Sequence, residues 1–188
     1  MNIRIATNQD RDDIKKVYSS AFPEGESKIV AKLAIDLLAE NSISQTISLV
    51  AEIDDSVVGH VALSPVVLEN NENCQAYILA PLAVLADYQK RSIGSALIEF
   101  GMQQLSEIGV NVVFVYGDPK YYERFGFNAD IARVYTTPYK LEYPFGWQAR
   151  VLNECTIEKT PVTINCVAAL CNLPRMNAFA ARPVLSII

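Results

Sequence analysis

The sequence predicts a single α/β domain of the α+β kind, and three observations lead to that prediction. The chain has 188 residues, which makes one domain at roughly 150 residues per domain. Hydrophobic residues form 51% of it and charged residues 20%, as in a globular protein that buries its own core. Segments with helical and with strand periodicity follow one another along the chain. We expect one domain over residues 1–188, with a regular core over about 1–130 and a less regular C-terminal third over 131–188.

The first predicted elements are a short strand and two helices. Residues 3–6 predict the strand, and a helix follows to about residue 20, capped by a threonine or an asparagine at its start. Apolar side chains recur at helical spacing over residues 27–40, which predicts the second helix. The Phe-Pro-Glu-Gly sequence between the two helices predicts a loop, and this loop holds Glu24 and Glu26.

Three strands are expected next. Residues 47–53 and 57–68 flank Asp54-Asp55, which is typical of a hairpin turn. A longer apolar stretch over residues 76–85 predicts the third strand.

The periodicity changes after Gln89. Apolar side chains at helical spacing predict a helix over residues 93–108, and Gly109 is typical of the position just after a helix. Residues 110–116 form a continuous apolar strand, which is expected in the centre of a sheet because both of its faces are apolar. A short helix is predicted over residues 120–125.

The C-terminal third is less regular because prolines interrupt it. Residues 162–170 resemble a strand, and Trp147 lies among many apolar residues. Three roles stay open for this third: it completes the sheet, lines a substrate pocket, or forms the face of a homodimer.

The charge excludes a general nucleic-acid binder. Lys and Arg total 16 against 21 Asp and Glu, a net charge of -5, whereas nucleic-acid binders carry an excess of basic residues. Residues 1–94 hold 13 acidic and 8 basic side chains and the remainder 8 of each, so the whole -5 belongs to the first half. Lys90 and Arg91 form a small basic spot within that half.

Membrane, export and metal sites are also unexpected. No run approaches the ~18 apolar residues of a membrane span, and residues 1–7 run directly into charge, so we expect no membrane partner and a cytoplasmic protein. The four cysteines lie among apolar residues and are expected to be buried free thiols. Because His60 is the sole histidine, a Cys/His metal site is a poor hypothesis and no metal is expected.

A strand-turn-helix junction over residues 82–97 is the most informative segment. The first turn of a helix has unpaired N–H groups and a partial positive charge that favour an anion. Gly94 allows close approach to a ligand, Ser92 can cap the helix, and Lys90 and Arg91 add positive charge. The segment contains neither G-x-x-x-x-G-K-S/T nor G-x-G-x-x-G. From the residues alone, anion binding and an ordinary solvated turn both stay open.

The junction resembles the signature of the GNAT acetyltransferase superfamily, R/Q-x-x-G-x-G/A. Gln89 matches its first position and Gly94 its last, while Ser92 stands where the family usually has its first glycine. Residues 121–127, Tyr-Tyr-Glu-Arg-Phe-Gly-Phe, resemble a second family element after the next strand, and the resemblance is strongest to the YhbS-type bacterial members. It covers about residues 1–130.

The resemblance implies a mixed, mostly antiparallel central sheet with helices on both faces, and acetyl-CoA as co-substrate. In that fold the central strands splay apart and the pantetheine arm lies between them. The backbone N–H near Val84 would then face the thioester carbonyl as an oxyanion donor. The residues implied to bind the cofactor are Val84, Leu85, Gln89, Lys90, Arg91, Ser92, Ile93, Gly94 and Ser95.

The resemblance implies that Tyr122 is the general acid. A phenol with a pKa of about 10 is protonated at neutral pH and can give its proton to the departing CoA thiolate. From the residues alone, a role in packing a short helix against the sheet is favoured for both Tyr121 and Tyr122. The motif context reverses this preference for Tyr122 and not for Tyr121. Residues 124–127 are interpreted as a chain reversal with aromatic anchors.

The general base is less evident. Glu24, Glu26 and His60 are candidates, Glu26 is retained as the base, and a water chain stays open as an alternative. No cysteine stands in a persuasive nucleophile position, which favours direct transfer over an acyl-enzyme.

The sequence therefore favours an enzyme that transfers an acetyl group from acetyl-CoA to the primary amine of a small molecule or peptide. The alternatives are a non-catalytic module of the same fold that binds or senses acyl-CoA, and a structural protein without a CoA site. The resemblance implies an acceptor site built by variable loops, so the sequence does not name the acceptor.

Overall fold

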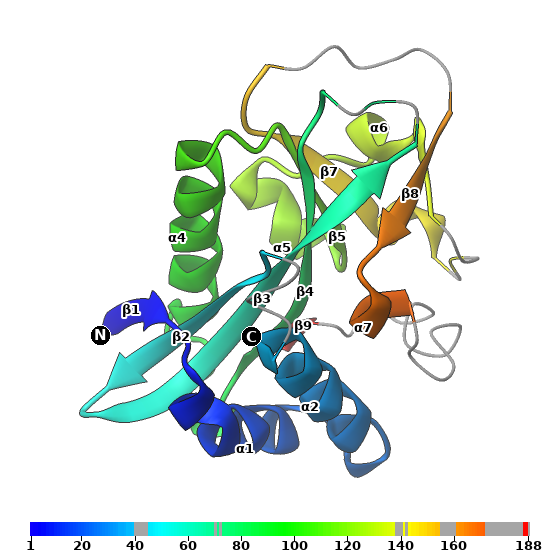
Figure 1. Ribbon diagram of the computed structural model, residues 1–188. Coiled ribbons are helices and arrows are strands. Elements are labelled where there is room, and N and C mark those ends of the chain that lie inside the picture. Colours follow the sequence, from blue (N-terminus) through cyan, green and yellow to red (C-terminus); the bar gives the residue numbers. More distant parts are fainter. Residues whose placement is uncertain are drawn as a thin grey trace. The chain divides into compact units, whose positions relative to one another are not determined.

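The computed structural model describes most of the chain as two compact units. The described residues are 1–39, 45–69, 71, 73–137, 141, 143–154, 161–171 and 186–187. Unit 1 comprises Met1–Ser64, Ala80–Gly101 and Ser186–Ile188, and unit 2 comprises Pro65–Leu79 and Met102–Leu185. Figure 1 labels most of the helices and strands of both units. The single domain expected from the sequence stays a prediction.

Unit 1 is built on neighbouring strands in the order β1 (Asn2–Ile5), β2 (Ile47–Ile53), β3 (Ser56–Leu68) and β4 (Ala76–Val84), of which β3 and β4 continue into unit 2. The pairs β1–β2 and β2–β3 are antiparallel. The β2–β3 turn has positive φ values of 49° and 59° at its two aspartates, as a tight type I′ hairpin requires. The predicted hairpin is confirmed.

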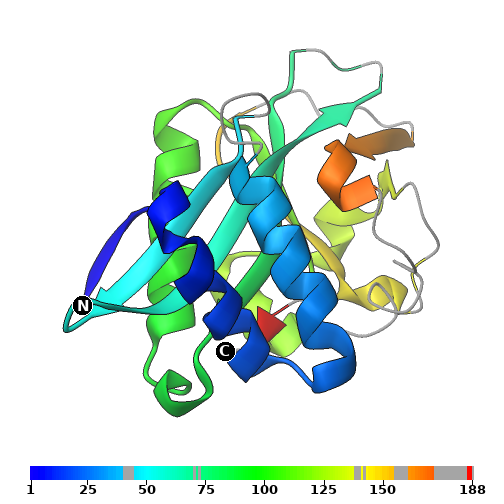
Figure 2. The ribbon, with the colours of Figure 1, turned by 60° about the horizontal axis from the view of Figure 1, so that its bottom comes forward.

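Helices cover both faces of the unit 1 strands. α1 (Arg11–Ala21) and α2 (Glu24–Ala39) pack against each other and cross the strands in Figure 2. The His60 side chain meets Tyr18 of α1, whereas a Cβ on Gly59 would point at Ile93 and Leu97 of α4 (Ile93–Glu107). Since successive strand residues face opposite sides, α1 and α4 lie on opposite faces.

The start of α2 corrects the sequence prediction. Glu24 and Glu26 were expected in a loop, but they lie in the first turn of α2. The Pro23 carbonyl accepts hydrogen bonds from the N–H groups of Glu26 and Ser27 at 2.8 and 2.9 Å. Acidic side chains are favourable in a first turn because they face the positive end of the helix dipole. The predicted helix end at Glu40 lies outside the described residues.

Thr7 starts the first helical segment, as one of the two residues expected to do so. A 3-10 turn, Asn8–Asp10, precedes α1, and Thr7 and Asp10 form a capping box. Asp10 also accepts two hydrogen bonds from Arg4, at 2.7 and 2.8 Å. The Arg4 guanidinium lowers the pKa of the Asp10 carboxyl to about 2, so this residue joins β1 to α1 as an anion.

Unit 2 places β5 (Val112–Tyr116) between two strands. β5 pairs in parallel with Ala76–Leu79 of β4 and antiparallel with β7 (Trp147–Val151). All five β5 residues are buried, so the predicted central strand is confirmed. The shorter elements are α5 (Pro119–Tyr122), α6 (Ala129–Ala132), β6 (Tyr135–Thr136), β8 (Val162–Cys166), α7 (Ala168–Cys171) and, in unit 1, β9 (Ser186–Ile187).

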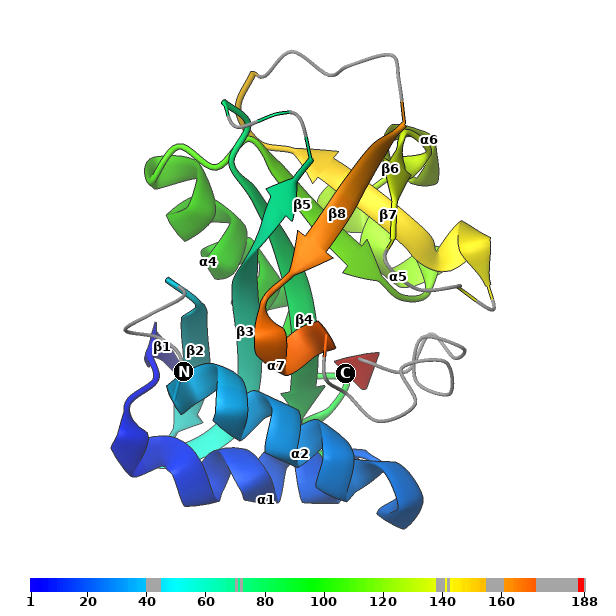
Figure 3. The same cartoon turned by 45° about the vertical axis from the view of Figure 1, so that its right-hand side comes forward.

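The C-terminal third contributes strands to unit 2, which favours the first of the three roles left open above. Trp147 begins β7 and stacks on Phe114 of β5, with ring centroids 5.1 Å apart and planes 4° apart. β8 pairs with Val66–Leu68 of β3 (Figure 3). The single strand expected over residues 162–170 is wrong, because β8 ends at Cys166 and a helical turn follows.

Candidate functional site

The turn after β4 is held in place by hydrogen bonds from three directions. The Leu85 N–H donates to the Val58 carbonyl of β3 at 2.9 Å, and the Ala86 N–H donates to the Ser20 hydroxyl of α1 at 3.2 Å. The side-chain amide of Gln89 reaches back and donates to the Val84 carbonyl at 3.2 Å. Gln89 therefore fixes the turn to the end of β4.

Two residues of this turn have the left-handed backbone conformation. Lys90 and Ser92 both have φ of 61°, in the region that costs a residue with a Cβ roughly 1 kcal/mol or more. The Ser92 carbonyl accepts the Ala96 N–H at 3.0 Å, which closes the first turn of α4. Ser92 thus begins the helix and also has the positive φ that explains why the family usually has glycine here.

The turn ends at the N-terminus of α4, which has a length of 15 residues. The N–H groups of Ile93 and Gly94 belong to the first turn, where no helical carbonyl precedes them to accept a hydrogen bond. Lys90 and Arg91 are exposed beside this end, and neither forms an ion pair within the described residues. Arg91 lies over the Tyr88 ring, 5.1 Å from its centroid. Backbone donors and side-chain cations together make an anion-binding turn.

Gly59 permits the close seating of α4 on β3. A Cβ at Gly59 would lie 3.1 Å from both Ile93 and Leu97, which is tighter than ordinary contact between side chains. Sequence analysis missed this role, although an isolated glycine within a strand signals the close approach of another element.

Within unit 1, β4 pairs with β9 along the edge that faces away from β3. Leu82 and Ala83 pair in parallel with Ser186 and Ile187 of β9. Val84 is the last residue of β4 and is 1% exposed. β9 therefore covers the backbone edge immediately before Val84, where the resemblance expects pantetheine.

Tyr122 lies in unit 2, at the end of the short helix α5. Asp118 caps that helix by accepting the Lys120 N–H at 3.0 Å, and proline follows at its first position. The Tyr122 ring lies against the backbone of Gly117, where a Cβ would be 2.3 Å from ring atom Cε2. Tyr122 is 1% exposed and meets Tyr121 edge-on with centroids 5.1 Å apart. Glycine at position 117 is thus a requirement of the observed Tyr122 position.

The segment after Tyr122 is the chain reversal expected from the sequence. Gly126 has φ of 80° and ends a 3-10 turn, Glu123–Phe125. Phe127 is 1% exposed, and Arg124 lies 3.9 Å from the centroid of the Tyr121 ring. The interpretation of these residues as structural is confirmed.

The three candidate bases differ in exposure. Glu24 is exposed, and Glu26 is half-buried with its Oε2 atom covered. His60, expected to be partly buried, is wholly buried between the hydroxyls of Tyr18 and Ser48, each 2.7 Å from a ring nitrogen. Burial lowers the pKa of His60 to about 3. His60 is therefore a neutral core residue. The Glu26 carboxylate is partly shielded from solvent and partly accessible to it.

Unit 1 brings together Val84, Leu85, the residues of the turn and Glu26, while Tyr122 belongs to unit 2. In the part of the chain that the structure describes, no group of three or more His, Cys, Asp or Glu side chains could hold a metal ion. Cys74 is buried, as expected, whereas Cys166, also expected to be buried, is half-buried because it ends β8. Cys155 lies outside the described residues, and only the backbone of Cys171 is described.

Comparison with known proteins decides the family. The profile of the acetyltransferase (GNAT) domain matches residues 2–129. The chain belongs to the GNAT acetyltransferase family. The uncharacterized N-acetyltransferase YjhQ of Escherichia coli K12 is 34% identical over 152 residues, which are 79% of this chain and 82% of YjhQ. The uncharacterized N-acetyltransferase YhbS of the same strain is 37% identical over 128 residues, 68% of this chain and 73% of YhbS.

Solved structures of GNAT proteins share the fold. The E. coli YhbS structure in complex with CoA has a TM-score of 0.79 and 28% identity, and covers 92% of this chain and 93% of that one. A GNAT acetyltransferase from Brucella melitensis in complex with acetyl-CoA has a TM-score of 0.69 and 29% identity, and covers 90% and 97%. The predicted GNAT fold, with its mixed, mostly antiparallel sheet, is confirmed.

As a GNAT family member the chain is an N-acetyltransferase. This favours the enzyme over the binding module and the structural protein. Among the described residues, no helix has the length and apolar character needed to cross a membrane.

Proposed function

We propose that this N-acetyltransferase binds acetyl-CoA at the turn between β4 and α4 and transfers the acetyl group directly to a primary amine of a small molecule or peptide. The observation that carries the proposal is the conformation of the turn. Two residues with left-handed backbone conformation, and the hydrogen bond from Gln89 to Val84, lead the chain into the N-terminal end of α4. Relatives with this fold are seen with CoA or acetyl-CoA.

The cofactor is held chiefly by backbone groups near its diphosphate. The N–H groups of residues 92–95 are the donors, Lys90 and Arg91 supply charge from the solvent side, and Gly94 gives room for the phosphate oxygens. An acidic protein can therefore bind an anionic cofactor, because the contacts are local.

The acyl end of acetyl-CoA is assigned to the end of β4. The Val84 N–H stabilises the oxyanion that forms when the amine attacks the thioester carbonyl, a kind of contact worth about 3 kcal/mol in other enzymes. Collapse of the tetrahedral intermediate breaks the C–S bond. The Tyr122 hydroxyl then gives its proton to the CoA thiolate.

Glu26 is assigned as the general base that removes a proton from the ammonium form of the acceptor. Its support is the half-buried position in the first turn of α2, with one carboxylate oxygen covered. His60 is unsuited, because it is enclosed by Tyr18 and Ser48. The acidic first half of the chain favours a cationic amine as acceptor by electrostatic attraction.

Two matched pairs of variants test these roles on an amine panel with acetyl-CoA. Tyr122→Phe lowers kcat at least about a hundredfold, with acetyl-CoA affinity retained, while Tyr121→Phe is close to wild type. Glu26→Gln lowers kcat and removes the acid limb of its pH profile, while Glu24→Gln does not. Normal turnover by Tyr122→Phe would show the general-acid role to be wrong. An unchanged pH profile in Glu26→Gln would show that water, and not Glu26, removes the proton from the acceptor amine.

A further inference from the structure

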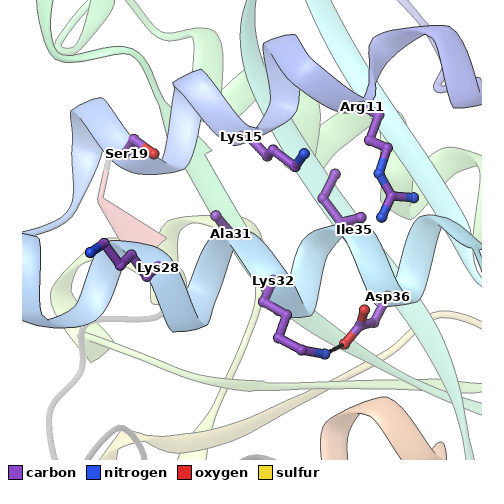
Figure 4. Close-up of a pocket in the computed structure, with 8 residues that line it drawn as sticks. All are labelled: Arg11, Lys15, Ser19, Lys28, Ala31, Lys32, Ile35 and Asp36. Carbon is purple, nitrogen blue, oxygen red and sulfur yellow. Dashed lines mark hydrogen bonds and ion pairs between the residues drawn. The ribbon is translucent and has the colours of Figure 1, made fainter.

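A groove between α1 and α2 has no role in the proposed reaction. It has a volume of about 380 Å³. Figure 4 shows Arg11 extending from α1 toward α2 at one end of the groove, and Lys28 of α2 at the other end. The groove lies wholly within unit 1. Its lining residues are Arg11, Lys15, Ser19, Lys28, Ala31, Lys32, Ile35 and Asp36.

The charge of this lining is opposite to that of the protein. Four of the eight lining residues are cationic and one is acidic, so the lining carries 4 − 1 = +3, whereas the chain carries -5. Residues 1–94 hold eight basic residues in all, and half of them line this one groove. A concentration of one sign in a concave surface attracts ligands of the opposite sign.

The cations form two pairs of like charges at a spacing that lowers helix stability. Arg11 and Lys15 are four residues apart on α1, and Lys28 and Lys32 are four residues apart on α2. Like charges at this spacing are neighbours on a helix and destabilise it, and here the two pairs line the same groove.

The neighbouring acids neutralise half of these cations. Lys15 pairs with Asp12 at 3.3 Å, and Lys32 pairs with Asp36. Within the described part of the chain, Arg11 and Lys28 have no ion pair. Two cations, one from each helix, are thus left for a ligand.

The groove also offers an apolar floor. Ala31 and Ile35 lie between the helices and are 7% and 2% exposed. We propose that this groove binds a small ligand that carries two or more phosphate or carboxylate groups, with Arg11 and Lys28 as its principal contacts. Because Arg11 and Lys28 lie at opposite ends of the groove (Figure 4), the ligand is elongated, with a body over the apolar floor and an anionic group at each end.

Calorimetric titration of the full chain at low salt tests the proposal, with two linear probes used separately: hexane-1,6-diol bisphosphate and octanedioate. We expect saturable binding of one equivalent of at least one probe, and the two arms distinguish a phosphate from a carboxylate ligand. Arg11→Gln/Lys28→Gln weakens that binding at least tenfold, while the charge-preserving Arg11→Lys/Lys28→Arg retains it. Lys16→Gln removes a cation of α1 that does not line the groove and leaves binding unchanged.

Thermal unfolding gives a second readout. The probe raises the Tm of the wild type and not of Arg11→Gln/Lys28→Gln, whose own Tm is no lower than that of the wild type because it lacks the like-charge pairs. The proposal is overturned if neither probe saturates, if the glutamine variant binds like Lys16→Gln, or if CoA displaces the probe and thereby places it at the turn after β4. Failure of CoA binding leaves these outcomes unaffected, so the two proposals fail separately.

Discussion

Ser92 combines two roles that ordinarily require different residues. Its carbonyl closes the first turn of α4, yet its φ of 61° is one that glycine adopts more readily. Sequence comparison with the family signature identified the position as a departure, but the residue alone could not reveal its backbone conformation. The structure shows that Ser92 has the left-handed conformation. Hydrogen bonds from the turn to the Val84 and Val58 carbonyls hold the backbone in this strained conformation.

Ser92→Gly is therefore expected to stabilise the protein. Removing the Cβ relieves the left-handed strain, partly offset by the greater freedom of glycine in the unfolded chain, so the free energy of unfolding rises by about 0.5 kcal/mol. Ser95→Gly, three residues along within α4, is the matched control and is expected to lower it by about 0.5–1 kcal/mol. Urea denaturation measures both variants, and a loss of stability in Ser92→Gly would contradict this account of the turn.

The buried histidine joins three elements through one side chain. His60 of β3 contacts the Tyr18 hydroxyl of α1 through Nδ1 and the Ser48 hydroxyl of β2 through Nε2. Burial lowers its pKa to about 3, compared with about 6.5 in an unfolded chain. The folded state therefore resists protonation that the unfolded state accepts below pH 6.5.

Between pH 6.5 and pH 3 the free energy of unfolding is expected to fall as the pH falls, by about 1.4 kcal/mol per pH unit from this group. His60→Gln keeps a donor and an acceptor but does not titrate, so its slope between pH 7 and pH 5 is expected to vanish whatever its stability at pH 7. Since His60 is the sole histidine, the comparison isolates one group. Equal slopes in the two proteins would disprove the pKa shift.

Pairing between distant strands explains what sequence analysis could not predict. The helices over residues 11–21 and 93–107 and the β2–β3 hairpin follow from local periodicity and turn residues. Pairing of β9 with β4 joins residues about a hundred positions apart, and no local pattern encodes it. The start of α2 was placed three residues late, because Pro-Glu-Gly was taken as a break although proline is favoured at a helix N-terminus.

β9 gives an expectation for cofactor affinity. It pairs with the edge of β4 that pantetheine is proposed to occupy, so acetyl-CoA must displace it. Removing residues 186–188 is expected to tighten CoA binding by at least about threefold, because the competent state no longer competes with a paired one. Removing Ile188 alone leaves both paired residues of β9 in place and serves as the control. Unchanged or weaker CoA binding by the longer truncation would show that β9 does not compete with the cofactor.

At the scale of the whole molecule, an acidic chain contains two local basic surfaces. The chain has a net charge of -5, carried by residues 1–94, yet the same half contains the Lys90-Arg91 turn and the basic α1–α2 groove. The family and fold were predictable because two motifs stand in order around a strand and a helix. The groove was not, because its four cations come together only when α1 and α2 pack side by side.

The central claim is that the turn over residues 89–95 holds the diphosphate of acetyl-CoA. The most direct measurement is a titration of the ¹⁵N-labelled protein with CoA and, separately, with pantetheine, followed through the backbone amide signals. The account predicts that CoA saturates with its largest shifts at the amides of residues 92–95, and that pantetheine, which lacks the diphosphate, leaves those amides nearly unmoved. Saturation by CoA without shifts at these amides, or no binding of CoA, would contradict it.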